Sequence, residues 1–120
     1  MSGGPLLFPC THAADDPERA TVPFILAATA AVSGHRAIVV CSIEGAWMAT
    51  DRIVEAEDPD LPPVTDLRQQ LLAAGGEVWC CSACAVKRGL TQDDLAEGCV
   101  IVGAATIIAA LAEGKAMNAA

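Results

Sequence analysis

Three of the six cysteines, Cys80, Cys81 and Cys84, lie within five residues of one another. Cys81 and Cys84 form a Cys-x-x-Cys pair that follows a short apolar run and precedes a segment typical of a helix. A thiol at the start of a helix faces unpaired backbone N–H groups, and this environment favours the reactive thiolate over the thiol. The spacing therefore predicts a reactive thiol site, with Cys81 and Cys84 as its candidate catalytic residues.

Two other predicted strands also end in a cysteine, and each is followed within three residues by a histidine or a glutamate. The carboxyl ends of parallel strands meet at one edge of a sheet, where α/β proteins bind their ligands. Side chains at these positions are therefore expected to line the pocket that contains Cys81. These candidate binding residues are Cys10, His12, Cys41 and Glu44.

The same side chains allow two other interpretations. Cysteine and histidine are the usual ligands of zinc, but zinc ribbons generally carry two Cys-x-x-Cys pairs and this chain has one. A bound metal, the one cofactor the sequence suggests, would be held by Cys10, His12, Cys41 and Cys81. Alternatively the thiols are inert, since free cysteine is among the most buried residue types. Cys80 is expected to be such a core thiol, because neighbouring residues of a strand point to opposite faces.

The elements that must position these residues alternate between short apolar runs and amphipathic segments. Strands are predicted at 5–10, 37–41, 77–81, 99–102 and 115–118. Helices are predicted at 17–32, 64–74, 82–88 and 104–112, with short helices at 46–50 and after Thr91. Strands that alternate with helices imply an α/β fold with a mainly parallel sheet, covered on both faces and joined by right-handed crossovers.

The first predicted helix carries clear signals at both ends. Asp16 is a suitable N-cap, Pro17 suits the first helical position, and Gly34 suits the position just after the last turn. Pro23 lies inside this helix and predicts a kink or a late start. The chain length fits a single domain over residues 1–120, with a flexible start at 1–4 and an acidic, proline-containing surface loop at 52–63.

Composition excludes several classes of function. A net charge of −8 argues against binding to nucleic acid, which requires clustered Lys and Arg. The longest uncharged runs are shorter than the roughly 20 apolar residues that a spanning helix needs, so no membrane insertion is expected. With no recognisable signal peptide, the chain is expected to be cytoplasmic, and its thiols reduced. An apolar fraction of 53% predicts that some apolar surface is used for homo-oligomer contacts.

Several local patterns together resemble the DsrE/DsrF-like family, which includes sulfur-relay proteins of the TusD-like kind. One pattern is a cysteine followed eight positions later by glycine, here Cys81 and Gly89. The segments that carry the resemblance are 15–20, 33–35, 78–89 and 98–104, and they are spread over nearly the whole chain.

The resemblance implies a three-layer α/β/α sandwich with a five-stranded parallel sheet, in trimers or hexamers. It also implies that Cys81 accepts a sulfur atom as a persulfide and exchanges it with sulfur donor and acceptor proteins. Cys84 would then be a resolving thiol, or one half of a Cys-x-x-Cys redox pair. The leading hypothesis is thus a sulfur carrier or sulfurtransferase. The alternatives are an oligomeric module that binds a metal or small ligand without catalysis, and a structural subunit with inert thiols.

Overall fold

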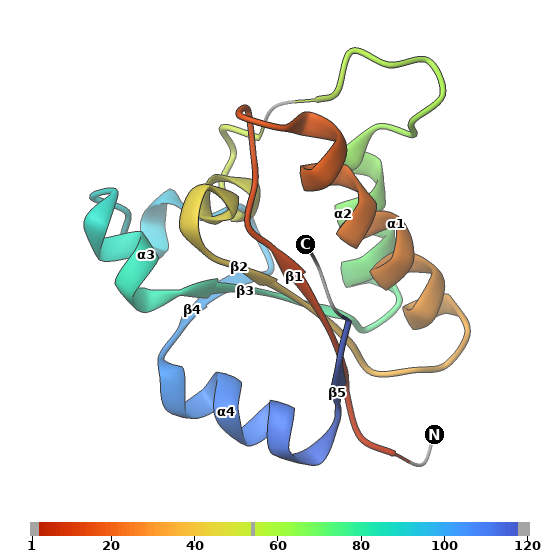
Figure 1. Cartoon of the computed structure of the whole chain (residues 1–120), viewed down its shortest axis with the longest axis vertical. Coiled ribbons are helices and arrows are strands. Elements are labelled where there is room, and N and C mark those ends of the chain that lie inside the picture. The colour runs from red at the N-terminus through yellow and green to blue at the C-terminus, as the bar shows by residue number, and fades with distance from the viewer. Residues whose placement is uncertain (1–2, 54, 118–120) are drawn as a thin grey trace.

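Five parallel strands form the centre of the fold. They are β1 (Leu6–Cys10), β2 (Ala37–Cys41), β3 (Glu77–Cys81), β4 (Cys99–Val102) and β5 (Lys115–Ala116). In the computed structural model, which describes residues 3–53 and 55–117, the strands lie in the order β4-β3-β2-β1-β5 (Figure 1). Strands rich in Val, Ile and Leu are typical of parallel sheets that are buried on both faces. The predicted parallel sheet of an α/β fold is confirmed.

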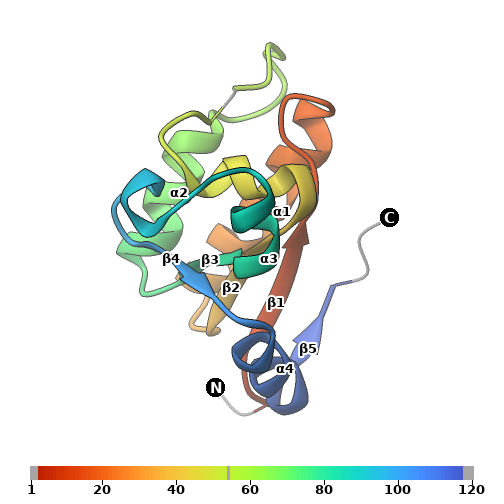
Figure 2. The same cartoon turned by 90° about the vertical axis from the view of Figure 1, so that its left-hand side faces the viewer.

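Helices flank this sheet on both faces. One face is covered by α1 (Pro17–Val32) and α2 (Val64–Ala73), and the other by α4 (Ala104–Glu113) (Figure 1). The short helix α3 (Ser82–Lys87) follows β3, and two 3₁₀ helices, η1 (Ile43–Ala49) and η2 (Gln92–Asp94), complete the helical elements of the described residues. Figure 2 shows α3 beyond the end of β3, beside η1. None of the described helices combines the length and the apolar character needed to cross a membrane.

The two faces are unequally covered. The α1/α2 side holds the larger core, which includes Phe24, Val39 and Val78. The α4 side has a small core whose buried members are Leu7, Ile38, Trp79 and Ala110. On α4 itself, Ile108 remains 61% exposed. A helix with apolar residues on its outer side is typical of a surface that contacts another element or another chain.

The predicted end signals of α1 are confirmed. The Asp16 side chain accepts a hydrogen bond from the Arg19 N–H at 3.1 Å, and Gly34 follows the helix with φ of +93°. The late start considered for Pro23 is not seen, because α1 begins at Pro17 and continues through it. A proline leaves the carbonyl four residues before it without an N–H partner. Here that carbonyl belongs to the exposed Arg19, where water can bind it.

Several other predicted boundaries differ in detail, most of them by one residue. The short helix predicted at 46–50 is η1, which begins at Ile43, so Glu44 lies in its first turn rather than in a loop. The last strand is described over Lys115–Ala116, and Asn118 of its predicted span lies outside the described residues. Residues 1 and 2 of the predicted flexible start lie outside them too, as does Val54 of the acidic loop, whose other residues form neither helix nor strand.

A buried arginine of α2 holds the end of η1 in place. Arg68 is 8% exposed, and its guanidinium Nη1 donates to the carbonyls of Met48 and Thr50 at 2.8 and 2.9 Å. These carbonyls lie at the C-terminal end of η1, where the last carbonyls of a helix have no N–H partner within the helix. Arg68 supplies the missing donors and so fixes η1 against α2.

A side chain closes the sheet at β4, one of its two edges. There the Gln92 amide donates to the Cys99 carbonyl at 2.8 Å and accepts from the Ile101 N–H at 2.9 Å, as a neighbouring strand would. The other edge strand is the short β5, and just after it the Met117 N–H donates to the Leu7 carbonyl of β1. Because residues alternate in direction along a strand, Pro9 of β1 faces the same side as Leu7, and proline has no N–H to offer there.

Candidate functional site

The six cysteines divide into two groups by burial. Cys81 and Cys84 are partly exposed, and they flank the junction of β3 and α3 at the carboxyl end of the sheet. The other four are 0 to 2% exposed and belong to the core on the α1/α2 side: Cys10, Cys41, Cys80 and Cys99. Accessible thiols therefore exist at one place among the described residues, the Cys-x-x-Cys pair.

The strand register explains this division. Cys10 lies beside Cys41, and Cys41 lies beside Cys80, so three thiols form a row across β1, β2 and β3. Cys81 is the next residue after Cys80 and therefore points to the opposite face of the sheet. The structure accordingly does not bring Cys10 or Cys41 into a pocket with Cys81. Cys80 occupies the place in the row where the sequence suggested Cys81, and it is buried as expected of a core thiol.

Two thiols of the row, those of Cys41 and Cys80, are held in the protonated form. A hydrogen bond with Cys10 and complete burial raise the pKa of Cys41 well above the ordinary value of 9.0. Burial, with the nearby Cys81 and Cys84 as smaller contributions, raises the pKa of Cys80 to about 11. Since the thiolate is the reacting form, both groups are poor nucleophiles at neutral pH.

Thiol titration checks this division directly. In native protein, an aromatic disulfide reagent should modify two cysteines within minutes, and tryptic mapping should place both labels on Cys81 and Cys84. After denaturation, all six cysteines should react. Rapid native labelling of Cys10 or Cys41 would contradict the burial described above.

Cys84 makes the most specific contact of the accessible pair. Its Sγ accepts a hydrogen bond from the Ile43 backbone N–H, with an N···S distance of 3.1 Å. Among the described residues, Ile43 is the one non-glycine with positive φ, at +56°. A β-branched residue in this conformation is a genuine outlier, because its side chain crowds the backbone. The same residue therefore combines an unfavourable backbone conformation with the N–H that donates to the Cys84 sulfur.

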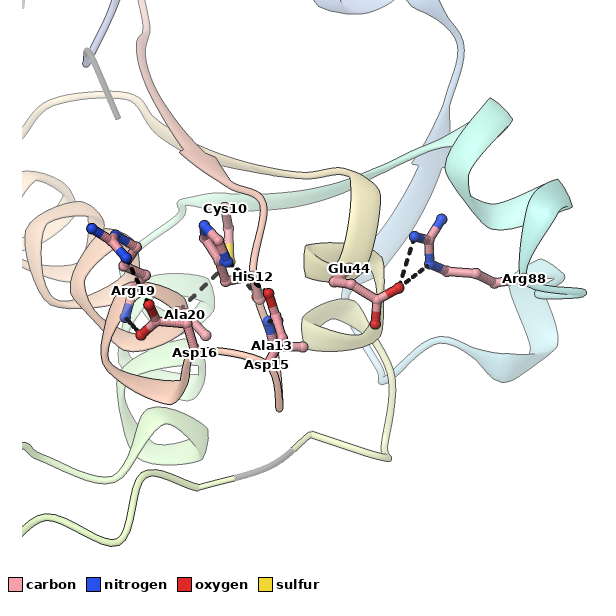
Figure 3. A network of polar contacts seen from close by, with 9 residues as sticks. All are labelled: Cys10, His12, Ala13, Asp15, Asp16, Arg19, Ala20, Glu44 and Arg88. Carbon is pink, nitrogen blue, oxygen red and sulfur yellow. Dashed lines mark hydrogen bonds and ion pairs between the residues drawn. The ribbon is translucent and has the colours of Figure 1, made fainter. Parts of the chain in front are cut away.

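An ion pair joins the same two elements. The Arg88 guanidinium donates to Glu44 Oε1 from Nη2 at 2.9 Å and from Nε at 3.3 Å (Figure 3). Its Nη1 donates to the Cys84 carbonyl at 3.2 Å. The Arg88 side chain is 11% exposed, whereas Lys87 is exposed. Glu44, a candidate binding residue in the sequence, is thus bound to Arg88 at the η1–α3 junction.

His12 lies in different surroundings. Its Nδ1 is 2.8 Å from Asp15 Oδ2, and it lines a groove of about 550 Å³ beside α1. Figure 3 shows this pair on the β1–α1 loop, apart from the Glu44–Arg88 pair. The Ala13 N–H, and then His12, lower the pKa of Asp15 below its ordinary value. No cysteine lines the groove, so the structure does not bring His12 to the thiol site either.

The residues suggested as metal ligands are separated by the sheet. Cys10 and Cys41 are in the core, Cys81 is on the opposite face, and His12 lies in the groove. Within residues 3–53 and 55–117, no three His, Cys, Asp or Glu side chains are grouped so that they could hold a metal ion.

Two residues of the site had no clear signal in the sequence. Ile43 contributes through its backbone, and isoleucine is a residue type that disfavours positive φ. Arg88 was recognisable as a nearby positive charge, but its partner Glu44 is 44 residues away in the chain. A search for an acidic residue just after the neighbouring strand would have found this pair.

Comparisons with known proteins agree with this architecture. The chain is similar in structure to MTH1491 from Methanobacterium thermoautotrophicum, a protein of unknown function, with a TM-score of 0.72 and 19% identity; the match covers 95% of this chain and 97% of that one. It is also similar to the ychN protein from E. coli, with a TM-score of 0.71 and 14% identity, over 95% and 96% of the two chains. No curated protein matches in sequence. The model of the DsrE/DsrF-like family matches residues 5–118, and the chain therefore belongs to that family.

Proposed function

We propose that this chain handles sulfane sulfur, with Cys81 as the acceptor thiol and Cys84 as its partner. Members of the DsrE/DsrF-like family are generally linked to sulfur relay. The observation that carries the proposal is the exposure of the cysteines. Of six thiols, the two accessible ones are adjacent in a Cys-x-x-Cys pair at the carboxyl end of the sheet. Ligands of parallel α/β sheets bind at this end.

The chemistry requires an accessible thiolate at each step. The Cys81 thiolate attacks the outer sulfur of a donor persulfide, the S–S bond of the donor breaks, and the donor leaves as a thiolate. Cys81 then carries the sulfur as a persulfide. A thiolate of an acceptor attacks the outer sulfur in turn, and Cys81 leaves as a thiolate, ready for another cycle. No redox cofactor is needed, because each step exchanges one S–S bond for another.

Partners follow from the same proposal. A sulfur donor protein and an acceptor protein would both have to reach Cys81 in the cytoplasm. DsrE-like proteins are typically oligomeric, and we propose that this chain forms a homo-oligomer, as a trimer or hexamer. The apolar outer side of α4, with Ile108 and Leu111 exposed, supports self-association.

Intact mass spectrometry tests the proposal. Purified protein would be incubated with a cysteine desulfurase and cysteine, and its mass would be measured without reductant. We expect Cys84→Ser, which lacks the partner thiol, to gain and keep the mass of one sulfur atom, and Cys81→Ser to gain none. Wild type should gain the same adduct and then lose it as Cys84 displaces the sulfur. Cys99→Ala, which removes a buried thiol, is the matched control and should load like wild type.

Two outcomes would overturn this assignment. An adduct that persists in Cys81→Ser would place the sulfur on another residue. Absence of any adduct on well-folded Cys84→Ser would exclude sulfur carriage from this donor and favour the alternative function, an oligomeric module that binds a small ligand.

A further inference from the structure

We infer that Glu44 and Arg88 are positioning residues that hold Cys84 in place as the resolving thiol of the pair. This inference rests on the sulfur-handling function proposed above. It concerns the η1–α3 contact, defined as the Glu44–Arg88 ion pair together with the hydrogen bond from the Ile43 N–H to the Cys84 sulfur. The contact is the structural feature that distinguishes Cys84 from Cys81.

Helix α3 depends on this contact for its position. It has six residues, of which only Ala85 is buried, while Val86 on its outer side is 77% exposed. A helix this short is not stable by itself and must be fixed by tertiary interactions. Arg88 lies at the C-cap of α3 and binds both the Cys84 carbonyl and the Glu44 carboxylate of η1. It thereby sets the distance between the Cys84 sulfur and the first backbone N–H of η1.

The strained backbone of Ile43 is a second, independent observation. Its positive φ costs free energy, and its side chain is 56% exposed, so burial of that side chain offsets little of the cost. In this conformation the Ile43 N–H donates a hydrogen bond to the Cys84 sulfur. The contact therefore fixes the Cys84 sulfur against the start of η1, next to the junction of β3 and α3.

Cys81 is the N-cap of α3 and Cys84 is the third residue of the same helix, so a persulfide on Cys81 and the Cys84 thiol share one helical turn and have a defined reaction. The Cys84 thiolate attacks the Cys81 sulfur, the S–S bond of the persulfide breaks, and the outer sulfur leaves as hydrosulfide. A disulfide between Cys81 and Cys84 remains, and an external dithiol reduces it to reset the site. The η1–α3 contact thus makes the chain a protein that releases sulfide, in addition to passing sulfur to an acceptor thiol.

Alkylation of Cys84 tests the positioning role without any sulfur donor. In a Cys81→Ser background, the rate of iodoacetamide modification at Cys84 would be measured as a function of pH. Arg88→Gln should raise the rate several-fold across the profile, because α3 is no longer tied to η1 and the half-buried Cys84 sulfur is freed from the Ile43 N–H. The milder Glu44→Gln should raise it less. The exchanged pair Glu44→Arg with Arg88→Glu should restore most of the profile.

The chain provides a matched control for this experiment. Arg36 and Glu77 form a second ion pair between separate elements, with an Nε–Oε2 distance of 2.9 Å, at the opposite end of the sheet. Arg36→Gln should leave the Cys84 profile unchanged. An unchanged profile in both Arg88→Gln and Glu44→Gln, or an equal rise in rate in Arg36→Gln, would overturn the positioning role.

Release of sulfide separates this inference from the proposed function. Wild type loaded at Cys81 should release hydrosulfide, and Arg88→Gln should release it about tenfold more slowly per loaded Cys81, because its Cys84 is no longer held in place. Equal release rates would overturn the resolving role of Cys84. If Cys84→Ser takes up no sulfur, the proposed function and the resolving role both fail, while the alkylation profiles still decide whether Glu44 and Arg88 position Cys84.

Discussion

Gly45→Ala is expected to lower the free energy of unfolding by about 3 kcal/mol or more, because the new methyl group has no space. A Cβ at Gly45 would lie 1.8 Å from the Cys10 carbonyl oxygen and 2.5 Å from its carbon. Both are backbone atoms, and the same carbonyl accepts the Ser42 N–H at 3.0 Å. Neither strand β1 nor η1 can move aside without breaking this hydrogen bond. Urea denaturation followed by circular dichroism would measure the loss.

Gly45→Ala should also change the thiol site formed by Cys81 and Cys84. Displacement of η1 moves Ile43 and Glu44 away from α3, so Cys81 and Cys84 should no longer be the only rapidly labelled thiols. Gly103→Ala is the matched control, because a Cβ at Gly103 meets nothing within 4 Å. If Gly103→Ala lowered the free energy of unfolding as much as Gly45→Ala, lack of space beside the Cys10 carbonyl would not explain the loss.

Arg68→Met should cost about 3 kcal/mol of unfolding free energy, although it preserves the apolar stem of the side chain. The substitution leaves the carbonyls of Met48 and Thr50 without their donor, and a buried polar group that loses its partner costs about 1–3 kcal/mol. Residue Thr50 is itself fully buried, so water cannot readily replace the guanidinium. Thermal unfolding would show a midpoint several degrees below that of wild type.

Arg19→Met provides the comparison for this result. The Arg19 side chain is 60% exposed, and its partner Asp16 lies on the surface as well. Removing an exposed charge of this kind changes stability little, so the unfolding midpoint should stay close to that of wild type. Equal midpoints for Arg68→Met and Arg19→Met would contradict the bridging role of Arg68.

The order of elements was predictable because local signals agree with the fold. The run 37–41 is a continuous apolar segment of the kind found in buried parallel strands, and Asp16 with Pro17 marks the start of α1. The family resemblance added the number of layers. Such signals depend on a few neighbouring residues, and the complete fold did not override them.

The arrangement of the site was less predictable, because it depends on register and on an unusual backbone conformation. Cys80 and Cys81 are adjacent in the sequence, and only the pairing of β2 with β3 decides which of them lies beside Cys41. A difference of one residue reverses the face of every side chain in a strand. Likewise, the positive φ of Ile43 contradicts the preference of its residue type, so no local rule predicts that its N–H meets Cys84.

The closed β4 edge of the sheet limits how another chain could pair with this one. An open edge strand is a template for pairing with another chain, and through it proteins form extended sheets and aggregates. Here Gln92 occupies the backbone groups of Cys99 and Ile101 in β4. Beyond the short β5, Pro9 of β1 lacks the N–H that a longer strand would use. Growth by strand addition is therefore disfavoured at β4, and contacts between copies of this chain would instead use surfaces such as the exposed side of α4.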